Sequence, residues 1–206
     1  MQSNKLSVKN DYVTQDSVYC YPETSILINK LNIHDKLLLE KKEHEIVSLR
    51  MSQLKKNPLY NGLDFSVQYI KRIHFFLFQD IYSWAGKYRT VRICKNDFMF
   101  SYPEYIDQEL DKEFAKLKSN SYFKDLSLTL FCEEITRFKI EINAIHPFRE
   151  GNGRVIRLLV EDIAFNAGYH VEFNQVTKND YINAMILSPT DEGPLKKLIT
   201  SITKPI

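Results

Sequence analysis

The 206-residue sequence lacks the features that mark several broad classes of protein. Its 3 cysteines are odd in number and far apart, which disfavours a disulfide framework or a zinc site and favours the reducing cytoplasm. No apolar run approaches the roughly 18 residues that a membrane-spanning helix needs. The net charge of +2 gives no argument for a nucleic-acid or membrane partner. We therefore expect a cytoplasmic protein that binds neither nucleic acid directly nor a membrane.

The composition is that of an ordinary globular chain. Hydrophobic residues make up 44% and charged residues 26%, enough for a sizeable core. There is no internal repeat and no low-complexity segment. The length suits one large domain, or one domain with an appendage.

The spacing of apolar residues predicts a mostly helical chain with one small β-hairpin. Glycine and proline positions divide the pattern into segments. We expect strands at 89–93 and 98–100, joined by a turn at Lys95-Asn96-Asp97. Helices are predicted at 34–56, from Asp64 or Ser66 to about Gly86, and at 103–118, 126–142, 155–167, 178–187 and 195–202.

Two of these helices carry specific expectations about packing. The segment 126–142 is the most apolar, so we expect it at the centre of the fold. The segment 34–56 is highly charged and needs an apolar stripe to pack against the rest. The residues expected to form that stripe are Leu37, Leu38, Ile46, Leu49 and Leu54.

The most informative segment lies between the two predicted helices 126–142 and 155–167. It is the run His146-Pro147-Phe148-Arg149-Glu150-Gly151-Asn152-Gly153-Arg154, with Arg157 one helical turn further on. Its glycine turn stands where a helix begins, and the exposed N–H groups and dipole of a helix N-terminus bind anions. A G-x-G pattern alone is more often a plain turn into a helix, so the neighbouring residues decide between the two interpretations.

The two arginines favour the anion site. Arg154 and Arg157 share one helix face near the N-terminus, where a cation opposes the helix dipole at a cost of about 0.3–1 kcal/mol. A bound polyphosphate would reverse that cost. The alternative is that both arginines pair with acidic neighbours on a solvated face.

Glu150 and His146 each have two interpretations. A carboxylate beside phosphates needs an intervening cation, and Mg²⁺ is the usual one, but a carboxylate at this position also caps a helix. Imidazole is a suitable base near neutral pH. A lone histidine is otherwise more often structural, which is the interpretation we give to His34, His44 and His74.

The run resembles the motif of the Fic family, H-P-F-x-[D/E]-G-N-G-R-x-x-R, and matches it at every defined position. Trp84-Ala85-Gly86 and the hairpin from Ile93 to Phe100 resemble the family's segments at those places, although many members have two glycines where Asn96 and Asp97 stand. The resemblance implies a Fic-type helical bundle with a hairpin flap beside the active-site loop. It places the Fic domain at 30–203, after an N-terminal extension at 1–29.

The resemblance implies a protein adenylyltransferase, which transfers AMP from ATP to a tyrosine, serine or threonine hydroxyl of a target protein and releases diphosphate. By position, His146 would be the general base. Glu150 would bind Mg²⁺ bridging the α- and β-phosphates.

The resemblance also implies how the nucleotide is held. The glycine turn would bind the phosphates, the arginines would bind the β- and γ-phosphates, and the flap would align a target segment as an added strand. One further residue would lie near the adenine. The residues at these positions are Gly151, Asn152 and Gly153 in the turn, Arg154 and Arg157, Lys95 and Asn96 in the flap, and Tyr181 near the base.

Many Fic enzymes carry an inhibitory helix, [S/T]-x-x-x-E-[G/N], whose glutamate pairs with the second motif arginine. The one match here, from Ser188 to Gly193, contains Pro189 and precedes Pro194, so we interpret it as a corner between helices. The segments Tyr21-Pro22-Glu23-Thr24 and Asn29-Lys30-Leu31 resemble bacterial Fic toxins that a separate antitoxin regulates. Such a partner would supply the glutamate to Arg157.

Two alternatives remain from the sequence. The chain could transfer another phosphate-containing group, although related enzymes that phosphorylate commonly have Ala and Lys where Gly151 and Gly153 stand. It could also be a nucleotide-binding interaction module, although binding alone does not require His146.

Overall fold

The computed structural model describes residues 18–59, 64–95 and 98–206. This part of the chain is mostly helical, as predicted. Its α-helices are α1 (Lys36–Lys56), α2 (Val67–Phe78), α3 (Ile106–Ser119), α4 (Leu128–Ile145), α5 (Asn152–Asn166), α6 (Lys178–Leu187) and α7 (Gly193–Ser201). Short 3₁₀ helices lie at Pro103–Tyr105, Ser121–Phe123 and Phe173–Gln175. The strand pairs are β1 (Cys94–Lys95) with β2 (Phe98–Met99), and β3 (Tyr169–Val171) with β4 (Thr203–Pro205).

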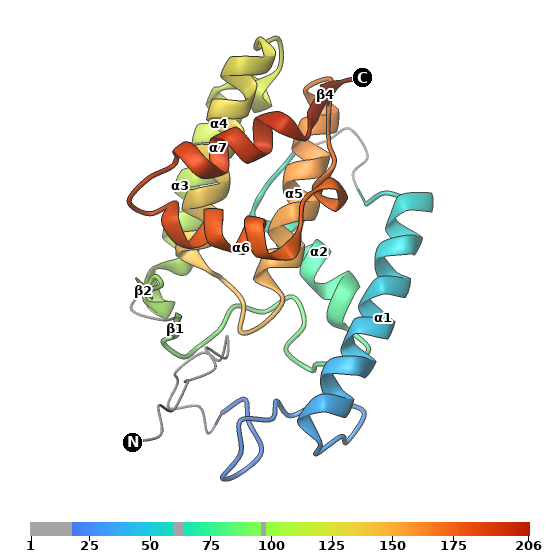
Figure 1. Ribbon diagram of the computed structural model, residues 1–206. Helices are drawn as coiled ribbons and strands as arrows, with labels where there is room; N and C mark the ends of the chain where they lie inside the picture. The colour runs from blue at the N-terminus through green and yellow to red at the C-terminus, as the bar shows by residue number, and fades with distance from the viewer. Residues whose placement is uncertain (1–17, 60–63, 96–97) are drawn as a thin grey trace, which may run out of the picture.

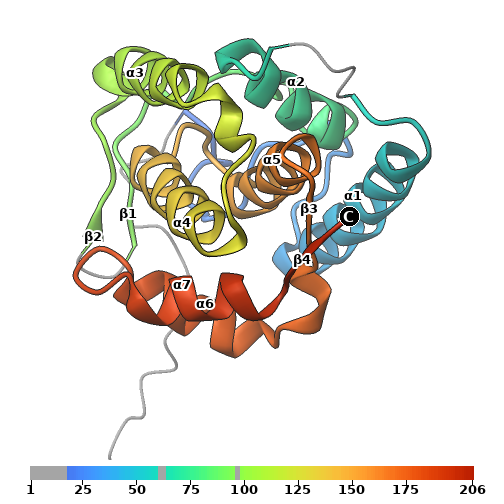
Figure 2. The same cartoon turned by 90° about the horizontal axis from the view of Figure 1, so that it is seen from above.

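Helices α4 and α5 form the centre of the molecule. The other helices surround them, with α6 and α7 together on one side (Figure 1, Figure 2). Helix α4 contacts α3, α5 and α7, and α5 contacts α2 and β3. Phe131, Ile135 and Ile142 of α4 are fully buried. The prediction of a central apolar helix is therefore confirmed.

Only part of the predicted apolar stripe of α1 faces the core: Leu54 is buried, and Ile46 is partly buried against the core. Leu37, Leu38 and Leu49 are exposed, while Leu39 and Val47 are buried. The cause is the position of α1 at the edge of the fold, where it contacts α2 along one narrow face (Figure 2). The positions of α1 that face the core are spaced i, i+4 and i+8. The exposed leucines lie on other faces of the helix and point away from the core.

Helix α2 begins after Ser66 and ends at Phe78, well before the predicted end near Gly86. The residues between Phe78 and Gly86 form turns. The N–H of Gly86 donates a hydrogen bond of 2.8 Å to Nδ1 of His74. This bond folds the chain back against α2 and brings the Trp84-Ala85-Gly86 segment beside it.

The hairpin is shorter than predicted, and its first strand is displaced. That strand, Cys94–Lys95, lies after the predicted segment 89–93 and includes Lys95, which was predicted in the turn. Arg89 and its neighbours have irregular backbone and bond elsewhere. The predicted turn residues Asn96 and Asp97 lie outside the described residues. The β3–β4 pair was not expected, because three-residue strands are too short to show a period-two pattern.

The proposed division into an extension at 1–29 and a domain at 30–203 remains a prediction. Of the described residues before position 30, Tyr19, Cys20 and Leu27 are buried in the common core. Tyr19 makes an edge contact with Trp84, with ring centroids 5.7 Å apart.

The contact between α2 and α5 includes a carboxyl group whose burial predicts a pH-dependent stability. Asp162 accepts a hydrogen bond of 2.6 Å from the Tyr69 hydroxyl, and burial raises its pKa to about 6. The folded state therefore holds this proton more tightly than the unfolded state, and stability falls as pH rises toward 6. We expect Asp162→Asn to raise the free energy of unfolding at pH 7 by about 1–2 kcal/mol, measured in urea.

The gain should shrink as pH falls toward 4.5, where the wild-type carboxyl is protonated in the folded state. Glu40→Gln, at an exposed carboxylate of α1, is the matched control and should show no such trend. A variant less stable than wild type at pH 7 would contradict the assignment.

Candidate active site

The predicted motif forms a short loop that joins the two central helices. His146 ends α4 in a left-handed conformation with φ 51°, and Gly151 precedes α5 with φ 85°. The N–H groups of the first turn of α5 therefore open at the end of the loop, where a helix has donors without internal partners.

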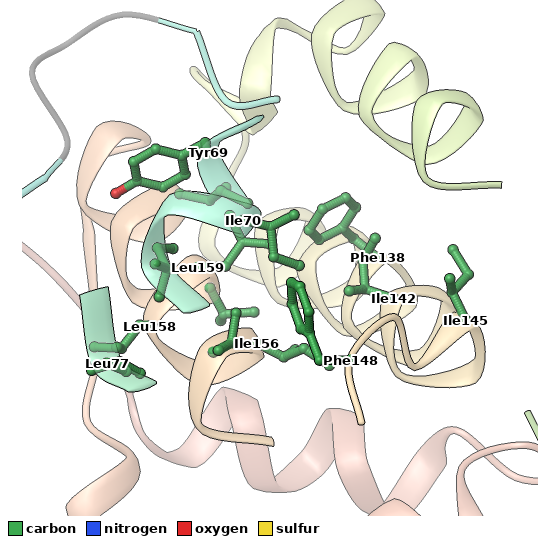
Figure 3. Close-up of a cluster of buried hydrophobic side chains, with 14 of the residues drawn as sticks. Tyr69, Ile70, Leu77, Phe138, Ile142, Ile145, Phe148, Ile156, Leu158 and Leu159 are labelled. Carbon is green, nitrogen blue, oxygen red and sulfur yellow. The ribbon is translucent and has the colours of Figure 1, made fainter. Parts of the chain in front are cut away.

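The side chains of Asn152 and Phe148 hold the loop in its conformation. The Asn152 amide donates to the Phe148 carbonyl at 2.7 Å and accepts from the Phe148 N–H at 2.9 Å. Phe148 is fully buried among residues of α2, α4 and α5 (Figure 3). Because the Asn152 side chain is used inside the loop, its predicted role in phosphate binding depends on its backbone N–H.

His74 supports the loop from α2. Its Nε2 lies 3.1 Å from the Glu150 carbonyl, and its ring stacks on Phe148 at 3.9 Å. Burial lowers its pKa to about 3, so the ring is neutral, accepts from Gly86 at Nδ1 and donates from Nε2. The structural interpretation of His74 is confirmed.

Arg89 links the loop to the approach of the flap, and this role was not predicted. Its side chain is 1% exposed and donates to the carbonyls of His146 (2.8 Å) and Ile145 (3.1 Å). It also donates to the carbonyls of Val91 (2.8 Å) and Ser101 (2.5 Å), on either side of the hairpin. A guanidinium carries five N–H donors in a rigid plane, which suits this set of acceptors. The local sequence contains no pattern that would have revealed it.

His146 is held in a defined orientation. It is 5% exposed, its ring stacks on Phe100 at 3.8 Å, and Nδ1 lies 3.1 Å from the Asn143 carbonyl. That contact places the proton on Nδ1, so Nε2 of the neutral ring carries the lone pair. Burial lowers its pKa to about 3, and the charges of Arg89 and Lys95 act in the same direction.

Glu150 and Arg154 meet at the start of α5, together with a residue from α1. The Glu150 Oε1 accepts from the Gly151 N–H at 2.8 Å and lies 3.3 Å from Arg154 Nη2. The same Nη2 lies 2.6 Å from Oε1 of Glu43, whose other oxygen accepts from the Tyr82 hydroxyl. Burial, followed by the Glu43 charge, raises the pKa of Glu150. Glu43 and Tyr82 were missed because they lie far from the motif in sequence.

Arg157 points to a different neighbour. Its guanidinium lies 5.5 Å from the ring centroid of Tyr181 in α6, and within the described ranges it has no carboxylate partner. Nζ of Lys139, a residue 1% exposed, lies 5.2 Å from the same ring and 5.5 Å from that of Phe173. The structure thus brings Tyr181 beside the second arginine and adds a buried cation that the sequence did not suggest.

The flap residues are only partly described. Lys95 lies in β1, and its charge acts on His146 as noted above. Asn96 lies outside the described residues, so its predicted role stays a prediction.

Glu150 fits a nucleotide-bound magnesium ion better than a protein-enclosed one. Its Oε2 receives no hydrogen bond from any described residue. The described ranges contain no group of three or more His, Cys, Asp or Glu side chains that could enclose a metal. Mg²⁺ commonly takes one or two carboxylates and completes its shell with phosphate oxygens and water.

Together these features define a helical protein with a buried, oriented imidazole beside the N-terminus of a central helix. Residues 64–164 match the family model for the Fic/DOC family. In the parts of the chain that the structure describes, no helix is long and apolar enough to cross a membrane.

The chain is similar to named relatives over most of its length. A "Probable protein adenylyltransferase" of Sinorhizobium fredii is 34% identical over 197 residues, covering 95% of this chain and 98% of that protein. The "Probable protein adenylyltransferase Fic" of Escherichia coli is 34% identical over 166 residues, 81% of each chain. The crystal structure of the BepC protein of Bartonella tribocorum with bound AMPPNP has a TM-score of 0.83 and 27% identity, covering 91% of this chain and 97% of that one. The chain belongs to the Fic/DOC family, as the motif predicted.

The two glycines of the turn should respond differently to substitution. A Cβ at Gly151 would overlap the buried ring of Phe78, at a φ that disfavours L side chains. A Cβ at Gly153 would meet only Nη1 of Arg157, at 3.7 Å. We expect Gly151→Ala to lower the free energy of unfolding by at least about 2 kcal/mol, measured in urea.

Gly153→Ala is the matched control. It stands in regular helix, so we expect equal stability or a gain of up to about 1 kcal/mol. Equal losses in the two variants would show that the Gly151 conformation is not required.

Proposed function

We propose that this chain is a protein adenylyltransferase that transfers AMP from ATP to a tyrosine, serine or threonine hydroxyl of a target protein. The observation that carries the proposal is that one short loop joins an oriented imidazole to the N-terminus of a central helix. The names of the relatives support the same activity. The AMPPNP bound in the BepC structure supports a nucleoside triphosphate as the substrate.

In this proposal His146 acts as the general base. Nε2 takes the proton from the target hydroxyl, whose oxygen attacks the α-phosphorus of ATP. The bond from the α-phosphorus to the oxygen bridging to the β-phosphate breaks, and diphosphate leaves. The pKa of His146 is low without a ligand, but the negative charge of a bound polyphosphate favours imidazolium and raises the pKa toward the range useful for a base.

The remaining residues hold charge and position the reactants, which is the protein's main contribution to phosphoryl-type transfer. The N–H groups of Asn152 and Gly153 bind phosphate oxygens at the start of α5, and that of Gly151 joins them once it leaves Oε1 of Glu150. Arg154 and Arg157 take the β- and γ-phosphates. Glu150 would hold Mg²⁺, which would supply positive charge to offset that of the polyphosphate.

In this proposal the flap lies at one end of the nucleotide and α6 lies at the other. Lys95 and Asn96 lie beside it and align the target segment as a strand added to β1–β2. Tyr181 lies near the adenine. Transfer is favoured over a binding module because His146 is held in the tautomer that a base requires.

Regulation of the proposed enzyme centres on Arg157. Ser188–Gly193 lies at the corner between α6 and α7, and Glu192 lies 3.9 Å from Arg137. That pairing and the turn geometry support the interpretation that the segment is not an inhibitory helix. We therefore propose that a separate small antitoxin supplies the glutamate that blocks Arg157.

His146→Ala tests the base. We expect AMP transfer from α-labelled ATP to target proteins to fall by about 10²–10⁴-fold, because the hydroxyl proton has no acceptor. AMPPNP binding, measured by calorimetry, should change little. The exposed His170→Ala is the matched control. Full labelling by the His146 variant would remove this residue from the reaction.

Glu150→Ala tests the metal site. Wild-type protein should bind AMPPNP about 10–100-fold more tightly with Mg²⁺ than with a chelator, and the variant should lose most of that difference. Glu104→Ala, at an exposed carboxylate, should retain it. An unchanged Mg²⁺ dependence in the Glu150 variant would exclude it as the ligand.

The purified chain tests the regulatory proposal. Without an inhibitory glutamate of its own, it should label targets with AMP as isolated, and Glu192→Gln should not increase the rate. Labelling that begins only when Glu192 is replaced would show that the inhibitor is internal.

A further inference from the structure

Glu43 of α1 reaches the candidate site from outside the motif. Its side chain is 13% exposed, on the face of α1 that carries the buried Leu39 and Val47. Its Oε1 accepts from Arg154 Nη2 at 2.6 Å, and its Oε2 accepts from the Tyr82 hydroxyl. Both oxygens of this carboxylate are therefore used by partners within the fold.

Tyr82 is a rigid partner. It is 1% exposed, and its ring stacks on Trp84 with centroids 4.4 Å apart and planes 14° apart. Burial, and then the charge of Glu43, raises its pKa far above the usual value, so the hydroxyl keeps its proton and donates. The position of the carboxylate is consequently fixed from the core side.

Among the described residues, the partners of Arg154 contact one of its three guanidinium nitrogens. Nη2 contacts Glu43 and, at 3.3 Å, Glu150, while the guanidinium lies 4.8 Å from the ring centroid of Phe78. Nε and Nη1 donate to no residue that the structure describes. The ion pair therefore orients the guanidinium and leaves N–H donors for an anion.

We propose that Glu43 is a positioning residue for the nucleotide: it holds Arg154 in its binding geometry before ATP arrives. An arginine side chain loses much conformational freedom when it is ordered, and a preformed ion pair removes that loss from the binding step. This inference rests on the proposed function, because it takes the anion at Arg154 to be the polyphosphate of ATP.

The geometry distinguishes positioning from competition. A competing carboxylate would occupy the donors that phosphate needs and would have to leave. Glu43 instead uses Nη2 alone and is tied to Tyr82, so a phosphate can bind the remaining N–H groups without breaking the pair.

Glu43→Gln is the decisive variant, because glutamine keeps the shape and an acceptor for Tyr82 but loses the charge that pairs with Arg154. We expect the Kd for AMPPNP with Mg²⁺ and the KM for ATP to rise about tenfold, with kcat at saturating ATP nearly unchanged. Glu45→Gln, on the same helix in an exposed pair with Lys42, is the matched control and should leave both constants unchanged.

A double-mutant cycle separates positioning from general structural support. In an Arg154→Ala background, Glu43→Gln should have no further effect on the Kd. A purely structural role would lower Tm and the active fraction in both backgrounds and leave the Kd unchanged, which would overturn the proposal. A lower Kd in Glu43→Gln would also overturn it, since that result identifies a competitor.

The outcomes for the two proposals are distinct. If wild-type protein transfers AMP and Glu43→Gln binds AMPPNP as tightly as wild type, only the positioning role fails. If wild-type protein binds AMPPNP, Glu43→Gln weakens that binding about tenfold, and no AMP transfer is detected, only the proposed function fails.

Discussion

The site depends on one buried cation, Arg89, that binds backbone carbonyl groups. The end of α4 turns sharply at His146, which leaves carbonyl groups there without helical partners. The Arg89 guanidinium donates hydrogen bonds to the carbonyls of Ile145 and His146. It also donates to carbonyls on both sides of the hairpin. An unsatisfied buried carbonyl is costly, so these bonds fix the imidazole and the flap relative to one another.

A second set of contacts fixes the other half of the loop. Phe148 is buried between the central helices. Asn152 bonds the backbone N–H and carbonyl of Phe148, and His74 bonds the carbonyl of Glu150. The loop is thus held by groups that have no direct part in the proposed chemistry. This arrangement fixes the orientation of the His146 ring relative to the start of α5.

Much of this could be predicted from the sequence, for physical reasons that differ by element. Helices α4 and α5 and the loop between them are encoded locally, by apolar period and by the glycines of the turn. Leu37, Leu38 and Leu49 show the limit of periodicity, because the rotation of an edge helix is set by its few tertiary contacts. Arg89 and Glu43 show a further limit, because the partners that link them to the site lie far away in sequence and no spacing relates them.

The single tryptophan lies within the network that this fold builds around the loop. Trp84 stacks on Tyr82, which bonds Glu43 and so connects to Arg154. Its emission is therefore sensitive to the packing of Tyr82 and has no competing tryptophan signal elsewhere in the chain. Intrinsic fluorescence offers an optical readout of the arginine proposed to face the nucleotide, without any attached dye.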